Sequence, residues 1–123
     1  MLALVFLAAS CSSSSEPSES TEGCANVIFA EVVKTGSSYR VTATVSSPDT
    51  GWEKYADRWV VRIPNGFVLR SRDLAHPHVT EQPFTRTLTG VRIPEGEEVV
   101  EIAAQDSVEG FCGKIVVLDV PGS

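Results

Sequence analysis

The chain has 123 residues, enough for one ordinary domain, and it carries 16 acidic residues against ten basic ones. Its formal net charge of −6 argues against a nucleic-acid-binding protein, because such proteins are usually basic. The two histidines exclude any site built from three or four imidazoles, and no apolar run approaches the roughly 18 residues that span a bilayer.

The N-terminal segment has the pattern of an export signal rather than of a domain. Residues 2–9 form a continuous apolar run, and the segment LAASC at residues 7–11 resembles the lipobox of bacterial lipoproteins. The resemblance implies a signal peptide over residues 1–10, cleavage before Cys11, and acyl chains such as palmitate on Cys11 that anchor the chain in a membrane. Two features depart from that pattern, because Ala8 replaces the usual Leu and no basic residue precedes the apolar run. A buried N-terminal strand is the alternative.

Residues 11–23 are predicted to be the lipidated cysteine and a disordered tether. The segment 12–23 contains only Ser, Glu, Pro, Thr and Gly, and three of its residues are glutamates. Such a composition cannot offset the entropy of ordering, so we expect a flexible coil that spans roughly 20 Å root-mean-square. Without these glutamates, residues 24–123 hold 13 acidic and ten basic residues, so the domain itself is only mildly acidic.

Residues 24–123 alternate apolar and polar side chains with period two and show no long helical period, which predicts an all-β domain. We expect seven strands, near residues 26–34, 39–45, 59–63, 67–69, 84–89, 100–104 and 116–120. Seven short strands in about 100 residues favour an antiparallel β-sandwich of the immunoglobulin or fibronectin type III kind. The segment TLTGVRIPEGEEVVEIAAQD at residues 87–106 resembles the E–F region of fibronectin type III domains. Residues 48–57 are also compatible with a helical turn.

Two cysteines remain for the domain if Cys11 carries lipid. Cys24 opens the first predicted strand and Cys112 precedes the seventh, so both lie at one end of a seven-stranded sandwich. Exported proteins meet oxidising compartments, so we expect a Cys24–Cys112 disulfide. A pair of metal-binding or redox thiols is the alternative.

Three predicted loops, at residues 46–57, 71–83 and 106–113, emerge at that same end and hold both histidines. Binding residues concentrate on loops carried by a rigid scaffold, so ligand binding is predicted here. The candidate ligand-binding residues are Trp52, Tyr55, His76, His78, Glu81, Asp106 and Phe111. Alternatively, Trp52 and Tyr55 plug the end of the sandwich. We also expect Asp57, Arg86 and Asp106 to form a polar network that braces the loops.

His76 and His78 flank Pro77 and would face the same side of an extended chain. Two imidazoles, with Glu81 or Asp106 completing the shell, would suit a copper or zinc ion. The other interpretation is that each histidine caps a turn or covers a sheet edge. No Gly-x-Ser-x-Gly elbow or glycine-rich phosphate loop is present, so we expect no enzymatic activity.

The motifs GWEKYAD at 51–57, HPHVTEQPFTR at 76–86 and DSVEGFCGK at 106–114 resemble those of small exported bacterial proteins with a sandwich-like domain. This resemblance covers roughly residues 51–121, and it brings no catalytic or binding residue with it. The sequence therefore predicts a lipid-anchored protein of the bacterial cell envelope that faces outside the cytoplasm. We expect a binding module for an envelope protein or small ligand, with no nucleic acid and no cofactor. The alternatives are a metal-binding protein using His76 and His78, and a structural protein without a small ligand.

Overall fold

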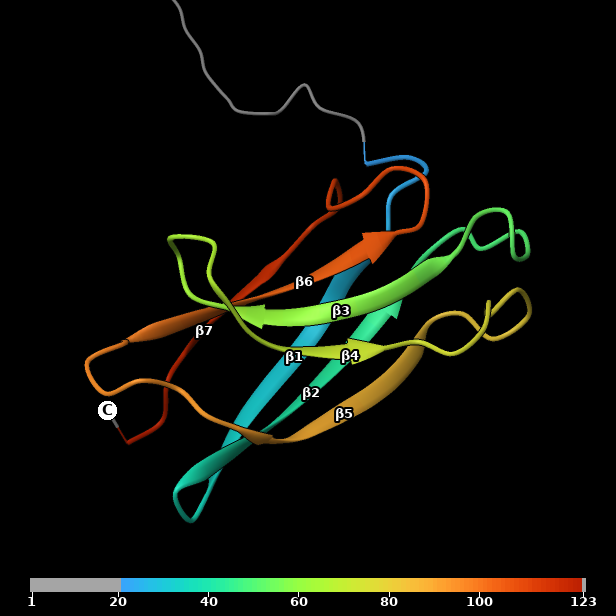
Figure 1. The fold of residues 1–123 in the computed structure, drawn as a ribbon. Helices are drawn as coiled ribbons and strands as arrows, with labels where there is room; N and C mark the ends of the chain where they lie inside the picture. The colour runs from blue at the N-terminus through green and yellow to red at the C-terminus, as the bar shows by residue number, and fades with distance from the viewer. Residues whose placement is uncertain (1–20, 123) are drawn as a thin grey trace, which may run out of the picture.

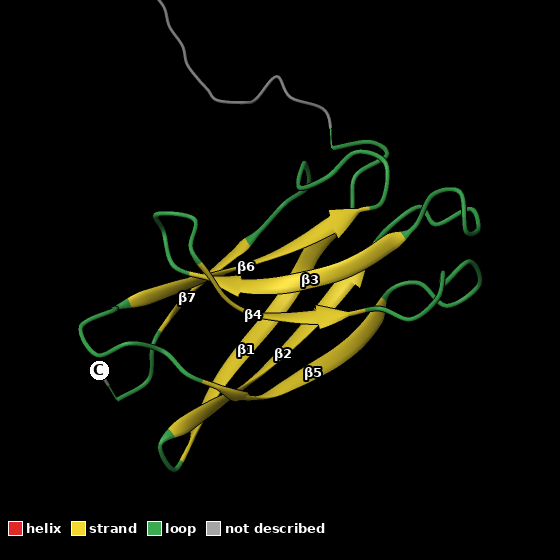
Figure 2. Ribbon diagram, viewed as in Figure 1, coloured by secondary structure: helices red, strands yellow, loops and turns green. Residues whose placement is uncertain are grey.

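The computed structural model describes residues 21–122, so the predicted signal peptide, Cys11 and most of the predicted tether lie outside the described residues. The described chain consists of strands, turns and loops, with no helix (Figure 2). Residues 48–55 form a loop with a tight turn at residues 52–53, and 56–57 begin a strand, so the helical turn considered for 48–57 is absent. The strands are β1 (Asn26–Thr35), β2 (Ser38–Ser46), β3 (Ala56–Arg62), β4 (Val68–Asp73), β5 (Phe84–Val91), β6 (Val99–Asp106) and β7 (Val116–Asp119).

The strands form two antiparallel sheets, which confirms the prediction of an all-β fold. One sheet has the order β1-β2-β5 and the other has the order β4-β3-β6-β7. Figure 1 shows the second sheet lying across the first, with β3 and β6 in front of β1 and β2. Two layers of this kind bury one face of each sheet against the other.

The core lies between the sheets and follows from the period-two alternation. In β2 the residues Tyr39, Val41, Ala43 and Val45 are buried, whereas the residues between them are partly or fully exposed. The largest fully buried side chains come from both sheets and include Trp59, Phe84 and Ile102. An alternating strand places every second side chain on one face, so the sequence pattern alone assigns these residues to the core.

The connections divide between the two ends of the sandwich. At one end lie the β2–β3 loop (47–55), the β4–β5 loop (74–83), the β6–β7 loop (107–115) and the start of the described chain (Figure 1). We call these the end loops. The β1–β2, β3–β4 and β5–β6 connections lie at the opposite end. This arrangement brings the predicted loop residues to one end.

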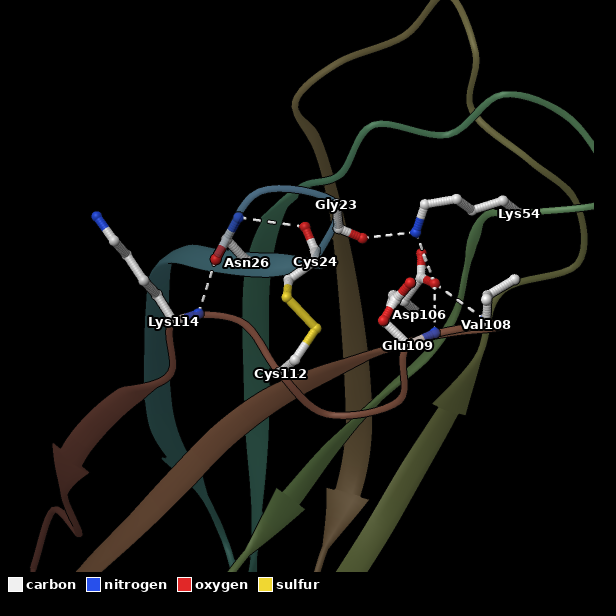
Figure 3. Close-up of a disulfide and its surroundings, with 9 residues drawn as sticks. All are labelled: Gly23, Cys24, Asn26, Lys54, Asp106, Val108, Glu109, Cys112 and Lys114. Atoms are coloured by element: carbon white, nitrogen blue, oxygen red, sulfur yellow. Dashed lines mark hydrogen bonds and ion pairs between the residues drawn. A yellow bond between two sulfur atoms is a disulfide. The ribbon is translucent and has the colours of Figure 1, made fainter. Parts of the chain in front are cut away.

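A disulfide joins Cys24 and Cys112, as predicted, across 88 residues of sequence (Figure 3). Next to it, the Val27 amide donates to the Lys114 carbonyl at 2.9 Å, and the Lys114 amide donates to Asn26 Oδ1 at 2.7 Å. Gly113 passes so close to Ala25 that a Cβ atom there would collide with the Ala25 carbonyl. In the chain-entropy model, closing a loop of this length stabilises the fold by about 4–5 kcal/mol. The β6–β7 loop is therefore fixed to the start of β1.

Candidate functional site

The β2–β3 and β4–β5 loops are joined through Asp49, a buried carboxylate. Its Oδ1 accepts hydrogen bonds from the Ala56 amide at 2.9 Å and the Ser47 hydroxyl at 2.6 Å, and its Oδ2 accepts one from the His78 amide at 2.9 Å. Gln82 adds a second connection, because its Oε1 accepts from the Ser47 amide and its Nε2 donates to the His78 carbonyl. Sequence reasoning did not select Asp49 or Gln82, because their partners are distant in sequence.

The β2–β3 and β6–β7 loops are joined through Asp106, which is 1% exposed. Lys54 Nζ lies 2.8 Å from Asp106 Oδ2 and also donates to the Gly23 carbonyl, so one ammonium joins its own loop to two other segments of the chain (Figure 3). The same Oδ2 accepts the amides of Val108 and Glu109 at 2.9 and 2.8 Å. Burial alone would raise the pKa of Asp106, but these donors outweigh it and hold that pKa below its ordinary value. Asp106 is therefore a structural anion.

The predicted network of Asp57, Arg86 and Asp106 is not brought together. Arg86 donates to His78 Nε2 at 3.0 Å and to Glu81 Oε1 at 3.4 Å, whereas Asp106 is bound by Lys54. Burial and repulsion from Asp106 contribute to a raised pKa for Asp57, whose Oδ1 has no hydrogen-bond partner among the described residues. Two separate clusters thus replace the single network, because Arg86 lies on β5 in the opposite sheet from Asp57.

The structure brings His76 and His78 together without making a metal-ligand set. Their ring centroids are 4.7 Å apart, but His78 is buried and stacks on Phe84. An arginine can only donate, so His78 Nε2 must accept from Arg86, and His78 Nδ1 is buried. Among residues 21–122, no group of three His, Cys, Asp or Glu side chains is arranged to hold a metal ion. The histidine pair therefore packs the β4–β5 loop against β5.

Trp52 and Tyr55 lie together on the β2–β3 loop. Their ring centroids are 5.5 Å apart in an edge-to-face arrangement. Trp52 is 67% exposed, so it does not plug the end of the sandwich. The Tyr55 backbone is fixed by Ser107, whose hydroxyl accepts from the Tyr55 amide and whose amide donates to the Tyr55 carbonyl. The exposed indole therefore stands on a braced segment.

Phe111 does not join Trp52, although both are candidate ligand-binding residues. Its ring lies 5.7 Å from the guanidinium carbons of both Arg58 and Arg62, which alternate on one face of β3. Between them, Val60 is fully buried yet lies outside the core cluster. Phe111 thus lies over the outer face of the β4-β3-β6-β7 sheet.

The opposite end of the sandwich contains a cavity of about 480 Å³. Its lining includes Lys34, Tyr39 and Val120, together with the β5–β6 connection at residues 93–98. Lys34 Nζ lies 5.0 Å from the centre of the Tyr39 ring. The sequence carries no signal for this cavity, because segments far apart along the chain form it.

Comparison with known proteins gives one informative similarity. A Halomicrobium mukohataei protein named "Putative lipoprotein" is 36% identical to this chain over 84 residues. The match covers 68% of this chain and 41% of that protein, so the chain spans less than half of its relative. No protein-family model matches the chain, and no solved structure matches it. Within residues 21–122, no helix is long and apolar enough to cross a membrane.

The Lys54–Asp106 pair predicts a large stability effect. In Lys54→Met, the buried Asp106 carboxylate loses its cation, so we expect the free energy of unfolding to fall by about 3 kcal/mol. Arg62→Met is the matched control, because Arg62 is as exposed as Lys54 but its partner Glu101 keeps 19% of its surface exposed, against 1% for Asp106, so the loss should be smaller. Urea denaturation of both variants checks this, and equal losses would contradict the structural role of Asp106.

His78 predicts a pH dependence of stability. Burial, then the charge of Arg86 and the neighbouring His76, lower the pKa of His78 below its ordinary value, against weaker opposing effects of Glu81 and Asp49. The unfolded chain therefore binds a proton that the folded chain does not, so stability falls as the pH falls through about 6.5, by at most about 1.4 kcal/mol per pH unit. We expect a lower thermal midpoint at pH 5.5 than at 7.5. His78→Gln should remove its contribution to that difference, whereas His76→Gln, which removes only a smaller cause than burial or Arg86, should retain most of it.

Proposed function

We propose that the protein is a cell-envelope lipoprotein, anchored through acylated Cys11, whose domain is a non-catalytic binding module. The lipobox-like segment at residues 7–11 and the similarity to a protein named as a lipoprotein support the anchor. In this proposal, residues 1–10 are the signal peptide, residues 11–23 the acylated cysteine and its tether, and residues 24–123 the domain outside the cytoplasm. The partner is an envelope component.

The domain is proposed to be of fibronectin type III kind. In immunoglobulin constant domains the fourth strand belongs to the sheet of the first two strands. Here β4 pairs with β3 instead, so the sheets have three and four strands with the orders β1-β2-β5 and β4-β3-β6-β7. The transfer of the fourth strand to the second sheet supports the fibronectin type.

The observation that carries the binding role is the exposed Trp52 on a braced loop. Exposed aromatic side chains are common anchors of interfaces, because they bury much apolar area and have few rotatable bonds. The loop that holds Trp52 is already fixed by Asp49, Lys54 and Ser107, so binding does not have to order it. Pre-organisation of this kind lowers the entropic cost of association.

The non-catalytic part of the proposal follows from the occupation of the polar groups at this end. Asp49 and Asp106 each accept backbone amides and connect loops, and His78 Nε2 accepts from Arg86. These contacts hold the loops together, and they occupy side chains that acid–base catalysis would need. Their arrangement suits a rigid binding platform.

The anchor is tested by metabolic labelling with a fatty-acid analogue. We expect the wild-type chain to take up label and to remain with the membrane pellet until detergent is added. Cys11→Ser should take up no label, because the acylated atom is absent, whereas the tether control Ser14→Ala should be labelled like the wild type. A wild-type chain that carries no label, or that washes off without detergent, contradicts the anchor.

The binding role is tested with a photo-crosslinking amino acid placed in the full chain in intact cells. At position 52 we expect adducts in several-fold higher yield than at position 67. Phe67 is the matched control, because it is an aromatic residue of similar exposure, 65%, at the opposite end of the sandwich. Equal yields at the two positions contradict a binding surface at the end loops.

A further inference from the structure

Each of the end loops exposes at least one large apolar side chain, and on the β6–β7 loop Val108 is more exposed than Phe111 or Ile115. Trp52 on the β2–β3 loop is 67% exposed, Val79 on the β4–β5 loop is 53% exposed, and Val108 on the β6–β7 loop is 61% exposed. Single exposed apolar residues are ordinary on protein surfaces. Here there is one on every loop at one end, and the loops are tied to each other through Asp49 and Asp106. We call these three side chains, one from each end loop, the apolar tips.

The chain leads away from the domain at the same end. Lys54 holds the Gly23 carbonyl and the disulfide holds Cys24, so the described chain begins beside the β6–β7 loop (Figures 1 and 3). Nine residues lie between Cys11 and Thr21, which makes ten Cα-to-Cα steps. Such a segment reaches at most about 35 Å when extended and roughly 18 Å root-mean-square as a coil. A lipid on Cys11 therefore keeps the apolar tips within a few tens of ångströms of the bilayer.

We infer that the apolar tips dock into the interfacial layer of the bilayer that holds the lipid anchor. The inference rests on the anchor proposed above and identifies the partner of the end loops as the membrane surface itself. Indole prefers the boundary between headgroups and acyl chains, because its ring is apolar and its N–H is polar. The anchor makes docking intramolecular, so a contact too weak to bind a free protein is sufficient.

The charges at this end indicate which lipid surface fits. Three glutamates, Glu53, Glu81 and Glu109, are exposed on the end loops against one exposed lysine, Lys114. Glu81 is paired with Arg86 and the ammonium of Lys54 with Asp106, so the rim remains mildly acidic. An acidic rim gains nothing from anionic headgroups, so apolar insertion rather than charge attraction drives the contact. Docking is therefore expected on zwitterionic lipid, without help from anionic lipid.

Most other exposed apolar side chains lie away from this end; Phe111 and Ile115 are on the β6–β7 loop, but the Phe111 ring lies beside the guanidinium groups of Arg58 and Arg62. Ile28 and Phe29 lie on β1, Val117 lies on β7, and Phe67 lies at the β3–β4 connection at the opposite end. A flat membrane that meets the apolar tips cannot reach Phe67 at the same time. Phe67 is thus a control of similar exposure.

The test uses the full acylated chain in phosphatidylcholine vesicles, with and without bromine on the acyl chains. Bromine quenches indoles that enter the bilayer, and the chain has only two, of which Trp59 is fully buried in the core. We expect bromine to lower the Trp52 emission at least twofold. Trp52→Phe, which retains only Trp59, supplies the unquenched baseline. Val79→Asp with Val108→Asp should reduce the quenching at least twofold, whereas Phe67→Ala should leave it unchanged.

The outcomes separate this inference from the anchor. An acylated chain whose Trp52 is quenched no more than the Trp52→Phe baseline overturns docking and leaves the anchor intact. If Cys11 takes up no label but added brominated vesicles still quench Trp52 of the free chain, the anchor is overturned and docking is retained. Quenching that rises severalfold with phosphatidylglycerol overturns apolar insertion. Photo-crosslinks from position 52 that contain a protein instead of a lipid also overturn docking.

Discussion

The ion pair between Lys54 and the buried Asp106 fixes the geometry of the end loops. One ammonium contacts the β6–β7 loop through Asp106 and the N-terminal segment through the Gly23 carbonyl. The carboxylate in turn accepts two amides of its own loop, and the disulfide then holds that loop to the start of β1. A buried carboxylate is costly without such partners, so the three segments are stable together and not separately. The direction in which the chain leaves the domain follows from this cluster.

Asp49 plays the corresponding role for the other pair of loops, and the two clusters are linked through the β2–β3 loop, which contributes both Asp49 and Lys54. The central loop is therefore held from both sides, and it is the loop that carries Trp52. An indole that is 67% exposed buries little apolar area and therefore contributes little to the stability of the fold. Placing it on the most extensively braced loop is consistent with selection for contact with another surface.

The strands and the disulfide could be predicted from sequence, because a strand has a local pattern and two cysteines allow only one pairing. Alternation in β2 assigns Val41 and Val45 to the core without knowledge of their partners, and an exported domain with two remaining cysteines has one pairing. Asp49 could not be predicted, because a loop aspartate acquires its role only from amides 7 and 29 residues away. The separation of Arg86 from Asp106 could not be predicted either, since it depends on sheet membership and loop path rather than on pattern.

Val79 and Val108 also could not be selected from the sequence alone. A single valine in a polar loop carries no sequence signal, and each becomes notable only because the fold brings its loop to the same end as the loop that holds Trp52. In the proposed arrangement, two restraints act on one end: a lipid on Cys11 and apolar side chains on rigid loops. A tether alone allows the domain to tumble, whereas three apolar contacts spread over three loops define a plane. A domain held by that plane turns its opposite end, with the cavity beside Lys34 and Tyr39, away from the bilayer. That end is then the part of the molecule that is most accessible to solutes of the envelope.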